Sequence, residues 1–191
     1  MVRMVALAGL SLGMAFAADP AYESAKRKID MVQEDRARPG SRVWLSLAEL
    51  NAYGRKAALD VAPQGLRNPR LELGNGAAAG SALIDFLKVR QIKGPAPNPL
   101  LAWFLSGERP VRAEARIESG VGRATVHLQK VTVSWMTAQG AVLDFLIENF
   151  LLPFYPEAKI GRPFELKHSV ERFEISPQGV NVIIAPKTAR R

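Results

Sequence analysis

The chain lacks cysteine throughout its 191 residues. This absence excludes disulfide bonds, and it excludes the lipid anchor that bacterial lipoproteins carry on a cysteine. The fold must therefore be stabilised by its hydrophobic core alone. At this length one domain that buries roughly 70 % of its unfolded surface is feasible.

Residues that carry chemistry are also scarce. The only two histidines, His127 and His168, lie in or beside expected strands, and neither has acidic neighbours at metal-ligand spacing. No GxSxG, P-loop or GxGxxG pattern occurs. We therefore predict no catalytic residues, no metal and no cofactor. An enzyme stays the alternative, because distant residues can assemble into a catalytic triad.

A dense basic block is missing, although the formal net charge is +8. Lysine and arginine are scattered along the chain and do not alternate with aromatic residues, so nucleic-acid binding is not expected. An anionic membrane surface suits this charge better. The alternative is an ordinary solvated basic surface.

The first residues resemble an export signal. Arg3 precedes the uncharged run 4–16, and Ala15-Phe16-Ala17 matches the small-x-small site of a signal peptidase. Thirteen helical residues span about 20 Å, which is short of the ~30 Å membrane core, so cleavage after Ala17 is favoured over a retained anchor. Residues 1–17 are thus predicted to be a signal peptide that directs the protein to the periplasm or outside the cell, where its net charge would be +7 without Arg3.

The remaining chain divides into three parts. Residues 18–40 are predicted to form an N-terminal helix and linker, residues 41–185 a single α+β domain, and residues 186–191 a disordered basic tail. Hydrophobic periodicity and turn residues predict the individual elements. They are a helix at 21–34, a strand at 43–45 that enters a helix from Ser46, hairpins at 70–86 and 169–184, strands at 111–119 and 123–135, and helices within 93–107 and 138–152.

The strand predicted at 123–135 changes phase. Val126 and Leu128 occupy even positions, whereas Val131 and Val133 occupy odd ones. A β-bulge near Gln129-Lys130 would place both halves on one face and bend the sheet.

The helix that begins at Ser46 carries a candidate structural anchor. Ser46 and Glu49 have capping-box spacing, and Gly54 lies within the apolar stripe, where it would let the helix approach a strand closely. Asn51 lies at the shoulder of that stripe, from which its amide could bond a neighbouring backbone group. A contact from Asn51 to a ligand is the alternative.

The helices predicted within 93–107 and at 138–152 are apolar on more than one side. A surface helix normally has one apolar stripe. The second apolar side of these helices must therefore be covered by loops of the same protein, by an apolar ligand or by a membrane. The candidate lipid-groove residues are Trp103, Phe104, Phe145, Leu146, Phe150 and Phe154.

The order of elements resembles a known family. A leader precedes "PGSRVWLSLAELNAYG", a hairpin that ends in "ALIDF", an alternating strand, an apolar helix and "FELKHSVERFEISPQGVNVII". This is similar to exported bacterial proteins of the tubular lipid-binding (TULIP-like) group, and the most specific piece is Ser46, Glu49, Leu50 and Asn51. The resemblance implies a long, bent, mainly antiparallel sheet wrapped around a helix, and an apolar groove for lipid tails.

Together these features predict an exported lipid-binding or lipid-handling protein that holds acyl chains between sheet and helices. The alternative is a cell-envelope interaction protein whose apolar helices bind a protein partner. The identity of the lipid and the oligomeric state do not follow from the sequence.

Overall fold

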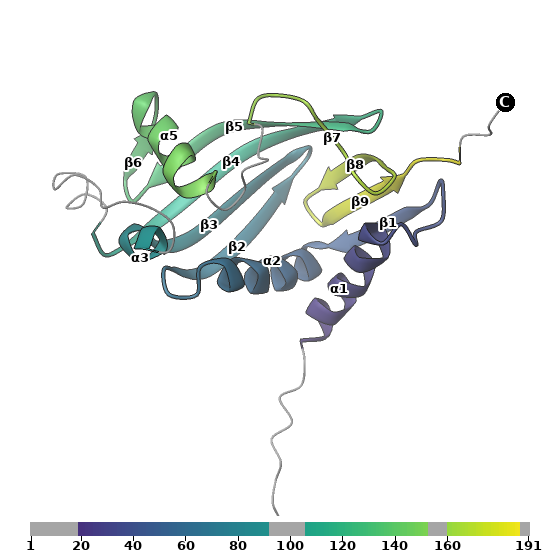
Figure 1. Cartoon of the computed structure of the whole chain (residues 1–191), viewed down its shortest axis with the longest axis horizontal. Coiled ribbons are helices and arrows are strands. Elements are labelled where there is room, and N and C mark those ends of the chain that lie inside the picture. The colour runs from purple at the N-terminus through teal and green to yellow at the C-terminus, as the bar shows by residue number, and fades with distance from the viewer. Residues whose placement is uncertain (1–18, 92–105, 153–159, 188–191) are drawn as a thin grey trace, which may run out of the picture.

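The computed structural model describes residues 19–91, 106–152 and 160–187, which form two open sheets with helices packed against them (Figure 1). The predicted signal peptide, the helix within 93–107 and the end of the basic tail lie outside the described residues. The described elements are α1 Pro20–Gln33, β1 Arg42–Ser46, α2 Leu47–Val61, β2 Leu66–Gly74, β3 Ala77–Asp85, α3 Phe86–Gln91, β4 Glu108–Gly120, β5 Arg123–Val133, β6 Met136–Ala138, α5 Ala141–Leu146, the π-helical turn η1 Ile147–Leu151, β7 Phe164–Glu165, β8 Val170–Ser176 and β9 Gly179–Ile184.

The strands form a large sheet and a small one. The large sheet has the order β2-β3-β4-β5-β6, with β7 also paired to β5, and the small sheet has the order β1-β9-β8. Every strand ladder is antiparallel, and Val126–Ile160 is an isolated parallel bridge. The α+β class with mainly antiparallel pairing is therefore confirmed, although the strands lie in two sheets.

Local sequence signals place the turns and the bend. Asn75-Gly76 connects β2 to β3, and Gly76 has the positive φ of +65° that glycine adopts easily. In the β4–β5 ladder Glu114 pairs with Lys130 and Ala115 pairs with Leu128, so Gln129 is the extra residue. The predicted β-bulge is confirmed.

The helix predicted at 138–152 is wrong in its limits. Ala138 pairs with Val131 as the last residue of β6, and Gly140, with φ of +51°, turns the chain before α5 begins. A helical stripe and a buried strand end are both apolar, which explains the error. For the same reason the alternation of apolar residues predicts a strand up to Phe86, whereas Phe86 begins α3.

The large sheet has an apolar inner face and a charged outer face. Paired residues share a face, so Leu71, Gly80, Ala113 and Val131 lie in one row across four strands of the inner face. On the outer face Arg112 bonds Glu72 and Glu114, each at 2.9 Å.

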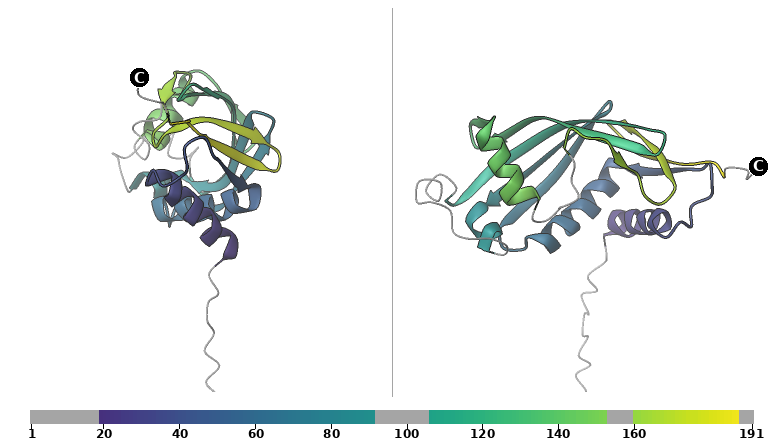
Figure 2. Two further views of the ribbon diagram at one scale, coloured as in Figure 1. Left: turned by 90° about the vertical axis from the view of Figure 1, so that its right-hand side faces the viewer. Right: turned by 45° about the horizontal axis from the view of Figure 1, so that its top comes forward.

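Two hydrophobic cores lie at opposite ends of the molecule. The first joins α1 and the small sheet, and it includes Ala25, which is fully buried. The second surrounds Phe86 and Val133, where α3, β5, β6 and α5 meet. Between these ends the strands of the large sheet curve over α2 (Figure 2). This middle part of the inner face holds the candidate site.

Candidate ligand pocket between helix α2 and the sheet

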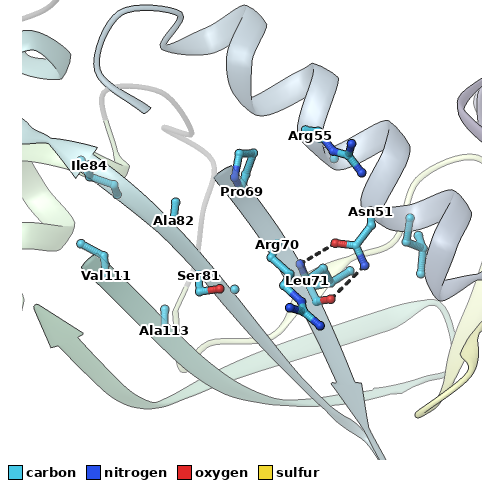
Figure 3. Close-up of a pocket in the computed structure, with 13 residues that line it drawn as sticks. Asn51, Arg55, Pro69, Arg70, Leu71, Ser81, Ala82, Ile84, Val111 and Ala113 are labelled. Atoms are coloured by element: carbon cyan, nitrogen blue, oxygen red, sulfur yellow. Dashed lines mark hydrogen bonds between the residues drawn. The ribbon is translucent and has the colours of Figure 1, made fainter. Parts of the chain in front are cut away.

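A pocket of about 370 Å³ lies between α2 and the inner face of β2, β3 and β4 (Figure 3). Its volume falls at the small end of the range of ~300–1,000 Å³ that is usual for ligand sites. Most of the lining is aliphatic, and several of these residues, including Leu71, Ala82 and Val111, stay partly exposed. The lining residues are Leu50, Asn51, Gly54, Arg55, Pro69, Arg70, Leu71, Gly80, Ser81, Ala82, Ile84, Val111 and Ala113.

Small residues create this space. A Cβ atom added at Gly54 or at Gly80 would meet no heavy atom within 4 Å, and neither glycine has a positive φ. The close helix–strand approach predicted at Gly54 is therefore wrong, because α2 stands away from the inner face at this point. Glycine serves neither packing nor backbone conformation at these two positions, and what it provides is room.

The start of α2 is fixed by the capping box that the sequence predicts. The Ser46 hydroxyl accepts a hydrogen bond from the Glu49 backbone N–H at 3.2 Å, and the Ser46 backbone N–H donates to the Glu49 carboxylate at 2.8 Å. Glu49 also accepts hydrogen bonds from Ser24 at 2.5 Å and from Lys28 at 2.6 Å, both on α1. One carboxylate therefore joins α1 to the beginning of α2.

The buried Glu49 carboxylate is held in its ionised form. Burial raises the pKa of Glu49, but the hydrogen bonds from Lys28, Ser24 and Ser46 together outweigh that effect and lower the pKa from 4.5 to about 2. The sequence predicted only the contact with Ser46. The partners on α1 could not be predicted, because they depend on how two helices pack.

Asn51 attaches α2 to the edge of the large sheet. Its Nδ2 donates to the Leu71 carbonyl at 2.9 Å, and its Oδ1 accepts from the Leu71 N–H at 2.8 Å (Figure 3). The Leu71 N–H and carbonyl lie on the open edge of β2 and point away from β3. Nδ2 also bonds the Leu47 carbonyl at 3.0 Å. We call the paired bonds the Asn51–Leu71 latch, and they provide the backbone contact expected of Asn51.

Replacing Asn51 by leucine is expected to lower the free energy of unfolding by about 2–3 kcal/mol, because the Leu71 N–H and carbonyl lose their partners. Urea unfolding measures this change. Asn149→Leu is the matched control, since the Asn149 amide donates to Phe145 within its own helical segment at 2.9 Å; its cost should stay under about 1 kcal/mol. Unchanged stability in Asn51→Leu combined with lost ligand binding would instead make Asn51 a ligand contact.

The predicted groove residues have a different location. Phe145 and Leu146 pack against the second core and do not line this pocket. Phe150 lies in η1, but its side chain is outside the described part of the structure, as are Trp103, Phe104 and Phe154. The pocket is therefore not among the predicted features. The signal that could have revealed it is glycine and alanine at inner-face positions.

Both histidines lie on the surface beside acidic residues. The Nε2 atom of His127 lies 3.6 Å from a Glu118 carboxylate oxygen, and the Nδ1 atom of His168 lies 3.7 Å from an Asp35 carboxylate oxygen. Within the described ranges, histidine and acidic side chains form no group of three that could hold a metal ion. Among the described helices, none is long and apolar enough to cross a membrane.

The fold and the pocket together define an α+β protein with antiparallel sheets and an apolar cavity beside a latched helix. Comparison with models of protein families, with curated proteins and with solved structures finds no match to this chain.

Proposed function

We propose that this protein is an exported lipid-binding protein that holds an acyl chain in the pocket between α2 and the large sheet. The observation that carries the proposal is the aliphatic lining of this pocket, which encloses about 370 Å³. Several of the aliphatic side chains in that lining stay partly exposed among the described residues. Each CH₂ group buried there would contribute about 0.8 kcal/mol, so a chain can be held with few polar contacts.

The TULIP-like arrangement is the finer part of this proposal. Support comes from the curvature of the large sheet over α2 (Figure 2). It also comes from the bulge at Gln129 in the β4–β5 ladder, because a bulge bends the strand that carries it. Export through cleavage after Ala17 belongs to the same proposal. A carrier of lipids between membranes would work in that compartment, and a binding site open at the side of a helix suits loading and release.

Mass spectrometry of lipid extracted from the purified mature protein tests the proposal. We expect one aliphatic species to be recovered in near-stoichiometric amount, and we expect it to be displaced by added fatty acid. A protein that contains no lipid and that binds neither fatty acids nor phospholipids would refute the proposal.

The second candidate is an envelope protein that binds a protein partner. It is favoured by the indole of Trp135, in the β5–β6 turn, which is 85 % exposed. Light scattering after size exclusion separates the two candidates. A stable oligomer without recovered lipid would favour the partner-binding function, whereas a lipid-loaded monomer would favour lipid binding.

A further inference from the structure

The strand register decides which lining residues turn their side chains into the pocket. Arg70 pairs with Ser81 and Ser81 pairs with Arg112, and the Arg112 guanidinium bonds Glu72 at 2.9 Å on the outer face. Because paired residues share a face, the side chains of Arg70 and Ser81 lie opposite the pocket, although both residues border it. The paired lining residues with side chains on the inner face are apolar, and they are Leu71, Ala82, Ile84, Val111 and Ala113.

Helix α2 adds apolar contacts and one solvated charge. The latch and the Leu47 carbonyl occupy the amide of Asn51. Arg55 borders the pocket but is exposed to solvent. Within the described lining, the interior of the pocket therefore offers a ligand only apolar contacts. A ligand that fits there must leave its polar group in the solvent, because a polar group buried inside would lose its hydrogen bonds.

The pocket has a limited length and a closed end. Its floor on β3 runs from Gly80 to Ile84, which is four residue steps or about 13 Å. An extended chain advances about 1.2 Å per bond, so this floor matches a chain of about twelve carbons. Ile84 and Val111 line the pocket and also pack against the second core. The second core therefore closes the pocket at this end.

We infer that the pocket selects its ligand by the aliphatic chain and not by the head group, and that the ligand is a single unbranched chain of about twelve carbons. The last methyl group lies against Ile84, and the head group stays in the solvent. This inference rests on the proposed function of the same pocket. Ile84 is then the residue that sets the chain length, and single-chain amphiphiles of any charge bind alike.

Displacement of the fluorophore Nile red by dodecanoate, dodecanol and dodecyltrimethylammonium at neutral pH tests the independence from the head group. We expect the three affinities to agree within about fivefold, because an exposed ion pair with Arg55 changes affinity by no more than this. A larger difference between any two of them would overturn the inference, since a polar group of the protein would then bind the head group. Failure of all three to displace Nile red would instead refute the proposed function itself.

A series of fatty acids from octanoate to hexadecanoate tests the role of Ile84. The affinity should rise about fourfold per CH₂ group up to about twelve carbons and then level off. In Ile84→Ala this limit should move up by about two carbons, because the removed side-chain atoms leave space. Leu83→Ala is the matched control, because Leu83 precedes Ile84 in β3 but pairs with Pro110 on the outer face and does not line this pocket.

Two results of this series would overturn the inference. The first is an affinity that keeps rising through hexadecanoate in the wild type, and the second is a limit that stays the same in folded Ile84→Ala or that also moves in Leu83→Ala. If Ile84→Ala does not fold, the series and the three head groups measured on the wild type still decide.

Discussion

Replacing Glu49 by glutamine is expected to lower the free energy of unfolding at neutral pH by about 3 kcal/mol. The two carboxylate oxygens each meet donors: Oε1 accepts from Ser24 and Lys28, and Oε2 accepts from the backbone N–H and hydroxyl of Ser46. A glutamine amide has one NH₂ group, which must face one of these two donor pairs in either orientation. The substitution therefore removes the charge and also places a donor against a donor.

The same carboxylate makes stability depend on pH. Its pKa is about 2 in the folded protein and 4.5 in the absence of these contacts, so the folded state binds the proton less readily than the unfolded state. The added stability is therefore fully present above pH 4.5 and is lost as the pH falls from 4.5 towards about 2. In Glu49→Gln this part of the acid dependence should disappear, which urea unfolding at a series of pH values measures.

Glu34→Gln is the matched control for this experiment. Glu34 pairs with Arg36 at 2.6 Å, but both side chains are 59 % exposed, so the loss should be under about 1 kcal/mol. If Glu49→Gln is as stable as the wild type at neutral pH, or if its stability falls with the wild-type slope below pH 4.5, the role given to Glu49 is wrong.

Several turns, caps and bends of the secondary structure were predictable because their signals are local. Ser46 and Glu49 lie one helical turn apart, Asn75-Gly76 is a turn by its own backbone preferences, and the phase change around Gln129 is visible within one strand. Each of these features depends on neighbours in sequence. The contacts of Glu49 with Ser24 and Lys28 depend on the packing of α1 against α2, so no local pattern could predict them.

The pocket was missed for a related reason. Large apolar side chains indicate an apolar site, and Phe145 and Leu146 are of this kind, but both pack against the second core. A cavity arises where side chains are small, and small residues give no signal until the register places them together. Gly80 and Ala113 are far apart in sequence, and only their pairing in the β3–β4 ladder shows that they share a wall.

Filling the pocket is expected to abolish lipid binding without cost to the fold. Gly80→Leu and Gly54→Leu each place an aliphatic side chain where a Cβ atom meets nothing within 4 Å. A leucine side chain displaces about four methylene groups of a ligand, so each single variant should weaken binding about 200-fold. Nile red displacement by dodecanoate measures this loss, and the double variant should show no detectable binding.

The stability of these variants should move in the opposite direction. Glycine in the middle of a helix or strand destabilises the fold by about 0.5–1 kcal/mol relative to alanine, and the new side chains would also cover exposed aliphatic surface. We therefore expect the free energy of unfolding to stay level or to rise by about 1 kcal/mol in each variant. Gly120→Leu is the matched control, because a Cβ atom there also meets open space, but Gly120 lies at the end of β4 and does not line the pocket.

A free energy of unfolding that rises while the affinity for lipid falls distinguishes a ligand site from a packing defect. Selection tolerates residues that weaken a fold where function requires them, and two glycines facing one cavity from α2 and β3 fit that pattern. Filled variants that still bind lipid as the wild type does would place the lipid elsewhere on the protein. Filled variants that unfold more readily would show that the space beside α2 closes when the protein is in solution. A more stable protein that has lost its ligand, with Gly120→Leu still binding, would establish that the cavity is kept open for that ligand.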